Sequence, residues 1–276
     1  IMGSLGMSGR AFIPMLLGFG CTVPAIMASR ALESRRDRLR VMLVTPFMSC
    51  SARLPVYILI AGAFFGKYAS VAAFSMYVIG LLTAILIARC TKGLHKKEKQ
   101  PPLLMELPDY KAPAMRTVIL YVWEKVRDYL TRAGTTIFLA SIVLWVLLNF
   151  GPGGFVTSME DSFAAWIGRG AAFLLKPCGL GMWQIAVALI AGVAAKEVVV
   201  SSLAVLFGIE NISSAAGTAA LRTSLAAYGF GAANAYALMV FVLLYIPCAA
   251  ALATIRSESK SWLWTAGAAV MQIGVA

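Results

Sequence analysis

Long apolar runs recur along this chain and are separated by short polar stretches. Residues 69–88 and 134–150 are almost wholly apolar, and about 20 such residues are enough for a helix to cross the hydrocarbon core of a bilayer. Inside a bilayer every backbone amide must find a partner in the protein, so spanning segments are helices or closed barrels. The alternation of apolar and polar residues typical of a membrane barrel is absent from the sequence. The sequence therefore predicts an all-α, polytopic transmembrane helix bundle.

The composition supports a membrane protein and argues against a nucleic-acid binder. The chain is 60% hydrophobic and 13% charged, whereas soluble domains average about 45–50% apolar and about 25% charged residues. Its formal charge of +12 is concentrated, with five arginines in residues 30–40 and ten lysines or arginines in residues 89–132. The positive-inside rule predicts that these stretches are cytoplasmic and that the turn at residues 66–68 is external. The lipid bilayer is an expected partner, and nucleic acid is not.

Two short segments share an unusual pattern. Residues 18–30 and 244–256 each place a cysteine beside a proline in an apolar stretch that ends on an arginine. Proline removes a backbone donor and clashes with the preceding helical turn, so both segments are predicted to be discontinuous or re-entrant helices. The residues expected to form the breaks are Gly20, Pro24 and Pro247. Each break is expected to leave backbone carbonyls free beside a thiol, which is a candidate ion site.

Three charged residues lie inside apolar stretches. Arg53, Lys196 and Glu197 would each cost about 2.5–3.5 kcal/mol at the centre of a lipid-facing helix, so they must face protein or water. One interpretation is structural: the charges pair, for example Glu197 with Arg53, and hold the bundle together. The other is functional: Glu197 lines an ion path. The sequence leaves both open.

The cysteines extend the candidate site. A buried cysteine is usually an inert small hydrophobe, but Cys21 and Cys248 both sit at predicted breaks, and Cys50 lies between two prolines. Thiols, freed carbonyls and a nearby carboxylate suit a divalent transition metal such as Fe(II) better than Mg²⁺ or Ca²⁺, which prefer oxygen ligands. The sequence favours equally a metal-ligand role and an inert structural role for Cys50. The residue types do not distinguish Fe(II) from Mn, Co or Zn.

The remaining segments receive simpler interpretations. Residues 115–132 have apolar residues at helical spacing with charges between them, which predicts an amphipathic helix on the cytoplasmic surface. Residues 134–150 are then a separate span. Residues 182–207 are expected to form a helix pair or re-entrant hairpin rather than one crossing, because a single crossing would place the basic turn after residue 255 outside. Residues 208–232 are expected to be a loop.

No motif for nucleotide hydrolysis or other familiar catalysis occurs in the chain. GxxxxGK[ST], GxGxxG after a strand, HExxH and GxSxG are all missing from the sequence. We therefore expect that this chain is not itself an enzyme. Any energy for transport would come from another part of the protein or from an ion gradient.

Several blocks carry a family resemblance. The long block GFGCTVPAIMASRALESRRDRLRVMLVTPFMSCSARLPVYILIAGAFF, followed by MELPDY, AAKEVVVSSLAVLFG and LYIPCAAALATIRSE, resembles the membrane portion of the FeoB family of bacterial ferrous iron transport proteins. The resemblance covers essentially the whole chain. It assigns two gate regions, centred on GCTVP and YIPC. These are the two discontinuous or re-entrant gate segments of the predicted bundle.

The resemblance implies uptake of Fe(II) across the bacterial cytoplasmic (inner) membrane. Cys21, Cys50 and Cys248 match the membrane cysteines of the family, and Glu197 lies in the matching KE motif. Fe(II) is then the transported substrate, and no permanently bound cofactor is expected. Relatives carry an N-terminal GTP-binding domain, so GTP belongs to a domain missing from this sequence. That domain, a small cytoplasmic accessory protein and further copies of the chain are the implied partners.

The resemblance also organises the chain into three parts. Residues 1–90 form a first gate region with a transmembrane hairpin, and residues 91–133 form a cytoplasmic basic loop with the amphipathic helix. Residues 134–276 hold a middle section and the second gate region, ending in a truncated span. We therefore expect an internal fragment of a longer polypeptide.

Two other functions compete with iron transport. A carrier for nucleosides or other polar solutes is an alternative, because gate-type repeats also occur in nucleoside carriers, although the polar side chains within the spans are few. A structural membrane scaffold is the second alternative, and it leaves the paired cysteine and proline breaks unexplained.

Overall fold

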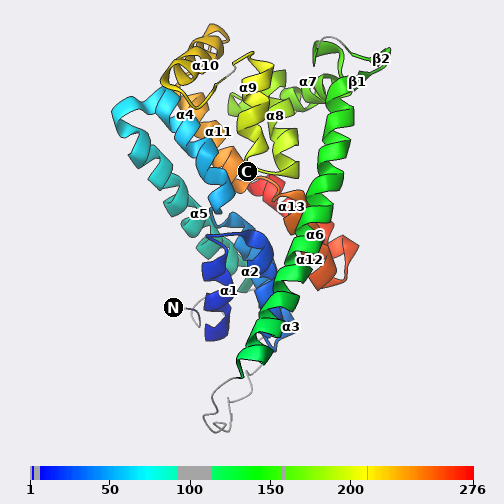
Figure 1. Ribbon diagram of the computed structural model, residues 1–276. Helices are drawn as coiled ribbons and strands as arrows, with labels where there is room; N and C mark the ends of the chain where they lie inside the picture. The colour runs from blue at the N-terminus through cyan, green and yellow to red at the C-terminus, as the bar shows by residue number, and fades with distance from the viewer. Residues whose placement is uncertain (1, 3–6, 93–113, 157–158, 210) are drawn as a thin grey trace.

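The computed structural model describes residues 2, 7–92, 114–156, 159–209 and 211–276, and the all-α prediction is confirmed there. The only strands in this part of the chain form a tight hairpin, β1 (Phe150–Gly151) and β2 (Gly154–Phe155) (Figure 1). The helices are α1 (Phe12–Leu17), α2 (Thr22–Ala28), α3 (Arg35–Val44), α4 (Leu54–Phe65), α5 (Ala69–Lys92), α6 (Met115–Asn149), α7 (Phe163–Leu175), α8 (Trp183–Ala194), α9 (Val198–Leu206), α10 (Ala215–Ala227), α11 (Ala232–Leu244), α12 (Ala249–Ser259) and α13 (Trp262–Val275).

Several helical stretches are suited to a bilayer. Within the described residues, three are long and apolar enough to cross a membrane: Arg35–Lys92, Met115–Asn149 and Ala232–Ser259. A fourth apolar stretch is bent by 104° between α7 with its following turn and α8. The structure is therefore consistent with a multi-pass membrane protein.

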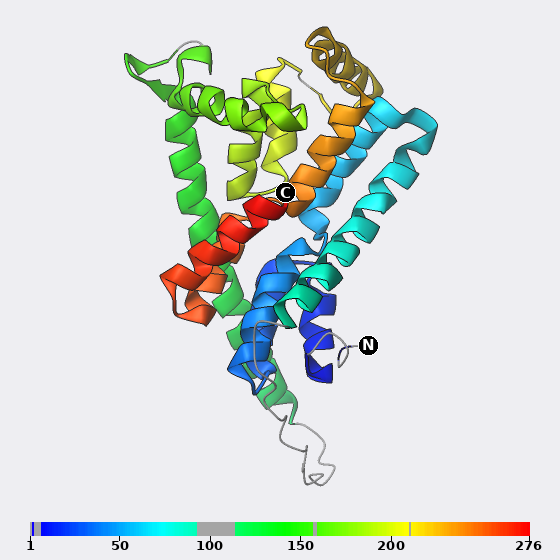
Figure 2. The ribbon, with the colours of Figure 1, turned by 180° about the vertical axis from the view of Figure 1, so that it is seen from behind.

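The two ends of the bundle differ in the charge of their connections. The arginine-rich start of α3 and the N-terminal end of α6 lie at one end, and the β hairpin and the α4–α5 turn at Gly66–Tyr68 lie at the other (Figures 1 and 2). The arginine-rich connection and the turn at residues 66–68 therefore lie at opposite ends of the bundle, which is the separation that the positive-inside prediction requires.

Both predicted gate segments are broken. Residues 18–21 separate α1 from α2, and residues 245–248 separate α11 from α12. Gly20 and Pro247 lie in these breaks, whereas Pro24 lies in the first turn of α2. An amide in that turn has no helical partner to lose, so proline is tolerated there. The glycines and the extended Cys21 therefore make the first break, without Pro24.

Residues 182–207 form the expected helix pair. Helices α8 and α9 lie side by side (Figure 1) and are joined by a short turn that carries Lys196 and Glu197. Gly192 allows this approach, because a Cβ there would lie 2.3 Å from Cγ2 of Val199. The hairpin interpretation is thus confirmed.

Residues 115–132 are helical as predicted, but the prediction that they form a helix separate from the span at residues 134–150 is wrong. Residues 115–149 form one continuous helix, α6, which runs along one side of the molecule (Figure 1). An isolated glycine costs a helix only about 1 kcal/mol, so Gly134 does not separate a surface helix from a span. The boundary predicted at residues 133 and 134 falls inside α6.

The loop predicted for residues 208–232 is also wrong. It contains α10, which begins with Ser214 accepting a hydrogen bond from the amide of Gly217 at 3.0 Å. Leu221 and Leu225 are both fully buried and lie one turn apart on the same face. Alanine has the highest helix propensity, so the small residues of this stretch indicate helix rather than loop.

The gate helices pack on a small apolar cluster of their own, next to the main core, which is formed largely by α4, α5, α8, α9 and α11. This gate cluster contains Val23, Ile26, Met42, Ala250, Ala251 and Ile255. Its residues come from α2, α3 and α12, so the second halves of the two gate segments contact each other directly. The packing brings their cysteine-bearing starts together.

Candidate metal centre

The breaks in the helices all border one cavity. It measures about 270 Å³ and lies where the gap between α1 and α2, the start of α4, the α8–α9 turn and the gap between α11 and α12 converge. The predicted site residues that line it are Gly20, Cys21, Cys50, Arg53, Lys196, Glu197, Pro247 and Cys248. These residues are spread over more than 200 positions of the chain. Of the residues predicted from the sequence, only Pro24 is not part of the lining.

The four candidate ligands share a backbone position. Cys21 immediately precedes α2, Cys248 precedes α12, Glu197 precedes α9, and Cys50 precedes the 3₁₀ turn Ser51–Arg53 that leads into α4. Each therefore stands where a helix starts after a break. Because all four breaks face one cavity, the backbone geometry places three thiols and a carboxylate on its walls.

The two buried cations bind backbone carbonyls. Lys196 is 2% exposed; its Nζ donates to the Ile246 carbonyl at 2.5 Å and lies 3.2 Å from the ring centroid of Tyr245. Arg53 is 1% exposed, and its two terminal nitrogens donate to the carbonyls of Met48 at 2.9 Å and Pro46 at 3.0 Å. A buried charge is tolerated when it is hydrogen-bonded in this way.

The carbonyl group at the first break is hydrogen-bonded to a neutral residue. The Gly20 carbonyl accepts from the amide of Ser51 at 3.2 Å and from its hydroxyl at 2.8 Å. Together with the contacts of Lys196, this differs from the expectation that the breaks leave carbonyls free beside the thiols. At Gly20 and Ile246 the carbonyls are already bonded to donors from neighbouring elements.

Glu197 is the exposed acid of the cavity. Among the described residues its carboxylate accepts no hydrogen bond and joins no ion pair, and it interacts electrostatically with Cys21. It does not pair with Arg53, whose terminal nitrogens bind carbonyls instead. The ion pair between Glu197 and Arg53, which the structural interpretation offered as an example, is therefore not formed in this conformation.

The candidate ligands share a cavity without converging on one point. In the described part of the chain, no three histidine, cysteine or acidic side chains are close enough to hold one metal ion. Metal bonds to sulfur and oxygen are about 2.0–2.6 Å long, so joint coordination requires the cavity walls to move closer. The ligand set Cys21, Cys50, Cys248 and Glu197 stays a prediction.

Sequence reasoning missed the contribution of α6. Tyr129 and Ile137 line the cavity, and Tyr129 packs with Cys21 against the gate cluster. The sequence pattern places Tyr129 on the apolar face of a surface helix. The helical spacing identifies the correct face, but nothing in the local pattern indicates that this face packs against the gate cluster rather than lipid.

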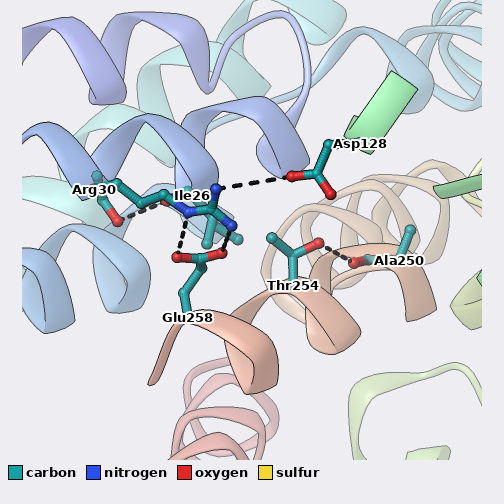
Figure 3. Close-up of polar contacts among 7 residues, drawn as sticks. Ile26, Arg30, Asp128, Ala250, Thr254 and Glu258 are labelled. Atoms are coloured by element: carbon teal, nitrogen blue, oxygen red, sulfur yellow. Dashed lines mark hydrogen bonds and ion pairs between the residues drawn. The ribbon is translucent and has the colours of Figure 1, made fainter. Parts of the chain in front are cut away.

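The far ends of the gate helices are joined by an ionic cluster. Arg30 forms two hydrogen bonds to the carboxylate of Glu258 at the end of α12, one of them 2.8 Å long, and its Nη1 lies 3.8 Å from Oδ2 of Asp128 on α6 (Figure 3). Hydrogen bonding to Glu258 raises the pKa of Arg30, so the guanidinium stays charged. Helices α2, α12 and α6 are thus tied together at the ends of α2 and α12 that lie away from the cavity.

Two family models match the sequence. The Gate model, described as nucleoside recognition, matches residues 1–64 and 130–262. The model described as ferrous iron transport protein B C terminus matches residues 73–125. The Gate matches include the three thiols and Glu197 of the cavity, and the second model covers the chain between them.

Curated relatives match almost all of the chain. The Fe(2+) transporter FeoB of Staphylococcus aureus strain MSSA476 is 42% identical over 98% of this chain, and that of Methanocaldococcus jannaschii is 42% identical over 96%. A Porphyromonas gingivalis relative, 38% identical over 96% of this chain, is named as a fusion of Fe(2+) transport protein A with FeoB. No solved structure matches the chain.

The chain spans about 40% of the length of these relatives, or slightly less: 40% of the S. aureus protein, 39% of the M. jannaschii protein and 36% of the fusion. Within that span, the breaks, the cysteines and the KE turn fall inside matched regions. The chain therefore belongs to the FeoB family, of which it is a membrane portion with two gate regions.

Proposed function

We propose that this chain is the membrane permease portion of a ferrous iron uptake transporter and that Fe(II) passes through the cavity between the helix breaks. The observation that supports this proposal best is the lining, in which three thiols and an exposed carboxylate share about 270 Å³. Sulfur ligands select for transition metals over Mg²⁺ and Ca²⁺. The names of the curated relatives point to the same ion.

The structure suggests the order of events for an incoming ion. Fe(II) from the outer side loses part of its hydration shell beside Glu197, whose carboxylate is free to approach a cation. Two buried cations also line the cavity, so a divalent ion is held only when cysteines bind as thiolates, which releases protons. Two or three weak ligands with residual water would permit release toward the cytoplasm.

The cavity described here corresponds to a closed state. Lys196 and Ser51 occupy carbonyls at the two gate breaks, and the candidate ligands do not yet converge. An ion that draws Cys21 and Cys248 together would bring the starts of α2 and α12 closer. Binding and gate movement are coupled in this proposal, because the ligands stand on the gate helices themselves.

The proposal assigns energy coupling and location to the complete protein. GTP binding belongs to a domain outside this chain, and the basic segments at residues 31–40 and 89–132 are the candidates for contact with it. The membrane is the bacterial cytoplasmic membrane. A small cytoplasmic accessory protein is a further partner, and the fused Fe(2+) transport protein A of the P. gingivalis relative supports this assignment.

The test is Fe(II) uptake by the full-length protein in proteoliposomes. C21S, C248S and E197Q are expected to lower the uptake rate about 10-fold or more, the scale on which changes around a metal site act. C90S is the matched control, because Cys90 is exposed on α5 and is not part of the cavity lining. Unchanged uptake in the cavity variants, with normal membrane insertion, would contradict the assignment.

A nucleoside panel tests the competing function. The Gate model is described as nucleoside recognition, and a nucleoside would need several amide or hydroxyl partners in its site. The hydroxyl donors of this lining are few, and that of Ser51 is bonded to Gly20. Competition for uptake by Mn²⁺, Co²⁺ or Zn²⁺ but not by nucleosides is expected. Saturable nucleoside uptake would favour the alternative.

A further inference from the structure

Helix α6 forms one wall of the cavity. Tyr129 and Ile137 lie two turns apart on the same face of α6, and both line the cavity. Tyr129 also packs against the gate cluster, as does Cys21. The Tyr129 side chain is half-buried, so it forms a partly accessible piece of the wall of the cavity that Cys21 also lines.

Helix α6 lies along one side of the molecule (Figure 1), and none of its described residues belongs to the main core. Its most apolar 18-residue window contains no buried residue, whereas 61% of the corresponding window in Ala232–Ser259 is buried. Segments with few buried apolar contacts open at lower free-energy cost than the packed core. Movement of α6 therefore disturbs less of the main core than movement of α11, whose residues lie within it.

Helix α6 is also longer than a bilayer requires. Its 35 residues extend about 52 Å at 1.5 Å per residue, whereas the hydrocarbon core is about 30 Å thick. The excess lies in the charged N-terminal half, which contains Arg116, Glu124, Lys125, Arg127 and Asp128. Force applied to this cytoplasmic extension would be transmitted along the helix to Tyr129.

The ionic cluster holds the three helices unequally. Glu258 binds Arg30 through two hydrogen bonds and therefore fixes α12 to the end of α2. Asp128 approaches the same guanidinium at 3.8 Å, beyond hydrogen-bond distance (Figure 3). Asp128 directly precedes Tyr129, so loss of its contact with Arg30 would release α6 next to the cavity, while the Arg30–Glu258 bonds would keep α2 and α12 joined.

We infer that α6 is a movable wall that closes the cavity from the cytoplasmic side, with Tyr129 as the positioning residue that covers Cys21 and Asp128 as the contact that holds α6 closed. The inference rests on the proposed function in that the cavity is the path of the metal. It adds a residue and a moving element that neither the breaks nor the candidate ligands identify.

The test measures access to Cys21 in the full-length protein. Inverted membrane vesicles are treated with a water-soluble, membrane-impermeant maleimide, and labelling of each cysteine is followed by mass spectrometry. D128N is expected to accelerate Cys21 labelling about two- to fivefold, the scale of a partly exposed ion pair. Y129A removes the cover itself and is expected to accelerate it about 10-fold, since the exposed area of the thiol increases directly.

Two controls separate α6 movement from general loosening. E33Q removes a carboxylate from the exposed Arg10–Glu33 pair at the same end of the bundle and is expected to leave Cys21 labelling unchanged. Cys50 lines the cavity from the start of α4 rather than beside Tyr129, so its labelling should rise less than that of Cys21. Equal acceleration of both cysteines, or no acceleration in D128N and Y129A, would overturn the inference.

The labelling is measured without iron, so the two proposals fail separately. Wild-type protein that carries no Fe(II) but shows the expected labelling pattern would retain the movable wall and lose the transport proposal. Protein that carries Fe(II) with identical Cys21 labelling in every variant would retain transport and exclude α6 as the wall that moves.

Discussion

The contact between the α8–α9 hairpin and the second gate break can be tested by Gly192→Ala. A Cβ at this position would lie 2.3 Å from Cγ2 of Val199 and 2.5 Å from the hydroxyl oxygen of Tyr245. Carbon atoms in ordinary contact are about 3.5–4.0 Å apart, so Val199 must shift by about 1 Å or more. Val199 and Tyr245 are 1% and 6% exposed, so neither has open space to move into.

The expected cost combines two effects. Overpacking a well-filled site costs about 1–3 kcal/mol. Displacing Tyr245 also weakens its contact with Lys196, and a desolvated cation–π contact contributes about 2 kcal/mol. Alanine recovers up to about 1 kcal/mol of helix propensity. We therefore expect G192A to lower the free energy of unfolding by about 2–4 kcal/mol.

The assay is unfolding by SDS in mixed micelles, followed by circular dichroism, with Gly62→Ala as the matched control. Gly62 lies in α4, and a Cβ added to it would meet no other atom within 4 Å, so G62A is expected to be neutral or to stabilise by up to about 1 kcal/mol. If G192A unfolds at the same SDS fraction as G62A, the close approach of α8, α9 and Tyr245 is refuted.

Two further predictions concern the buried arginine and the corrected helix. R53M removes the donors of the Pro46 and Met48 carbonyls and is expected to destabilise the protein by about 3 kcal/mol, at about 1–3 kcal/mol per unsatisfied carbonyl; SDS unfolding that matches wild type would contradict these bonds. S214A removes the N-terminal cap of α10 at a cost of about 1 kcal/mol. Hydrogen exchange should accelerate in α10 amides alone, and fast exchange of these amides in wild type would argue against the helix.

The sequence predicted the elements that depend on local chemistry. Apolar runs identified the spans, and the unusual residues around Cys21, Pro247 and Lys196 identified the breaks, because a break in a membrane helix requires residues that a continuous helix avoids. Two elements were misread for a physical reason. Gly134 and the small residues of α10 are compatible with both helix and loop, and tertiary packing decides between them.

The candidate site could be predicted only in part. Each ligand candidate was recognisable alone, since a thiol or charge in an apolar run is costly or unusual. Their partners were not, because Lys196 bonds to a carbonyl 50 residues away and Ser51 to one 31 residues away. The contribution of Tyr129 depends on how α6 lies against α2 and α12. The residue pattern on one helix does not identify which other helix packs against it.

The carbonyls of Gly20 and Ile246 are already hydrogen-bonded, which affects how readily sodium and potassium ions could leak through the cavity. Sodium and potassium are held in proteins mainly by clusters of oxygen atoms, and K⁺ channels use rings of carbonyls for this purpose. Here the resident ammonium of Lys196 and the hydroxyl of Ser51 already hold those oxygens. Alkali ions, although abundant, find poor coordination at the resting breaks, and a pathway of this kind would dissipate little of the cell's monovalent gradients between turnovers.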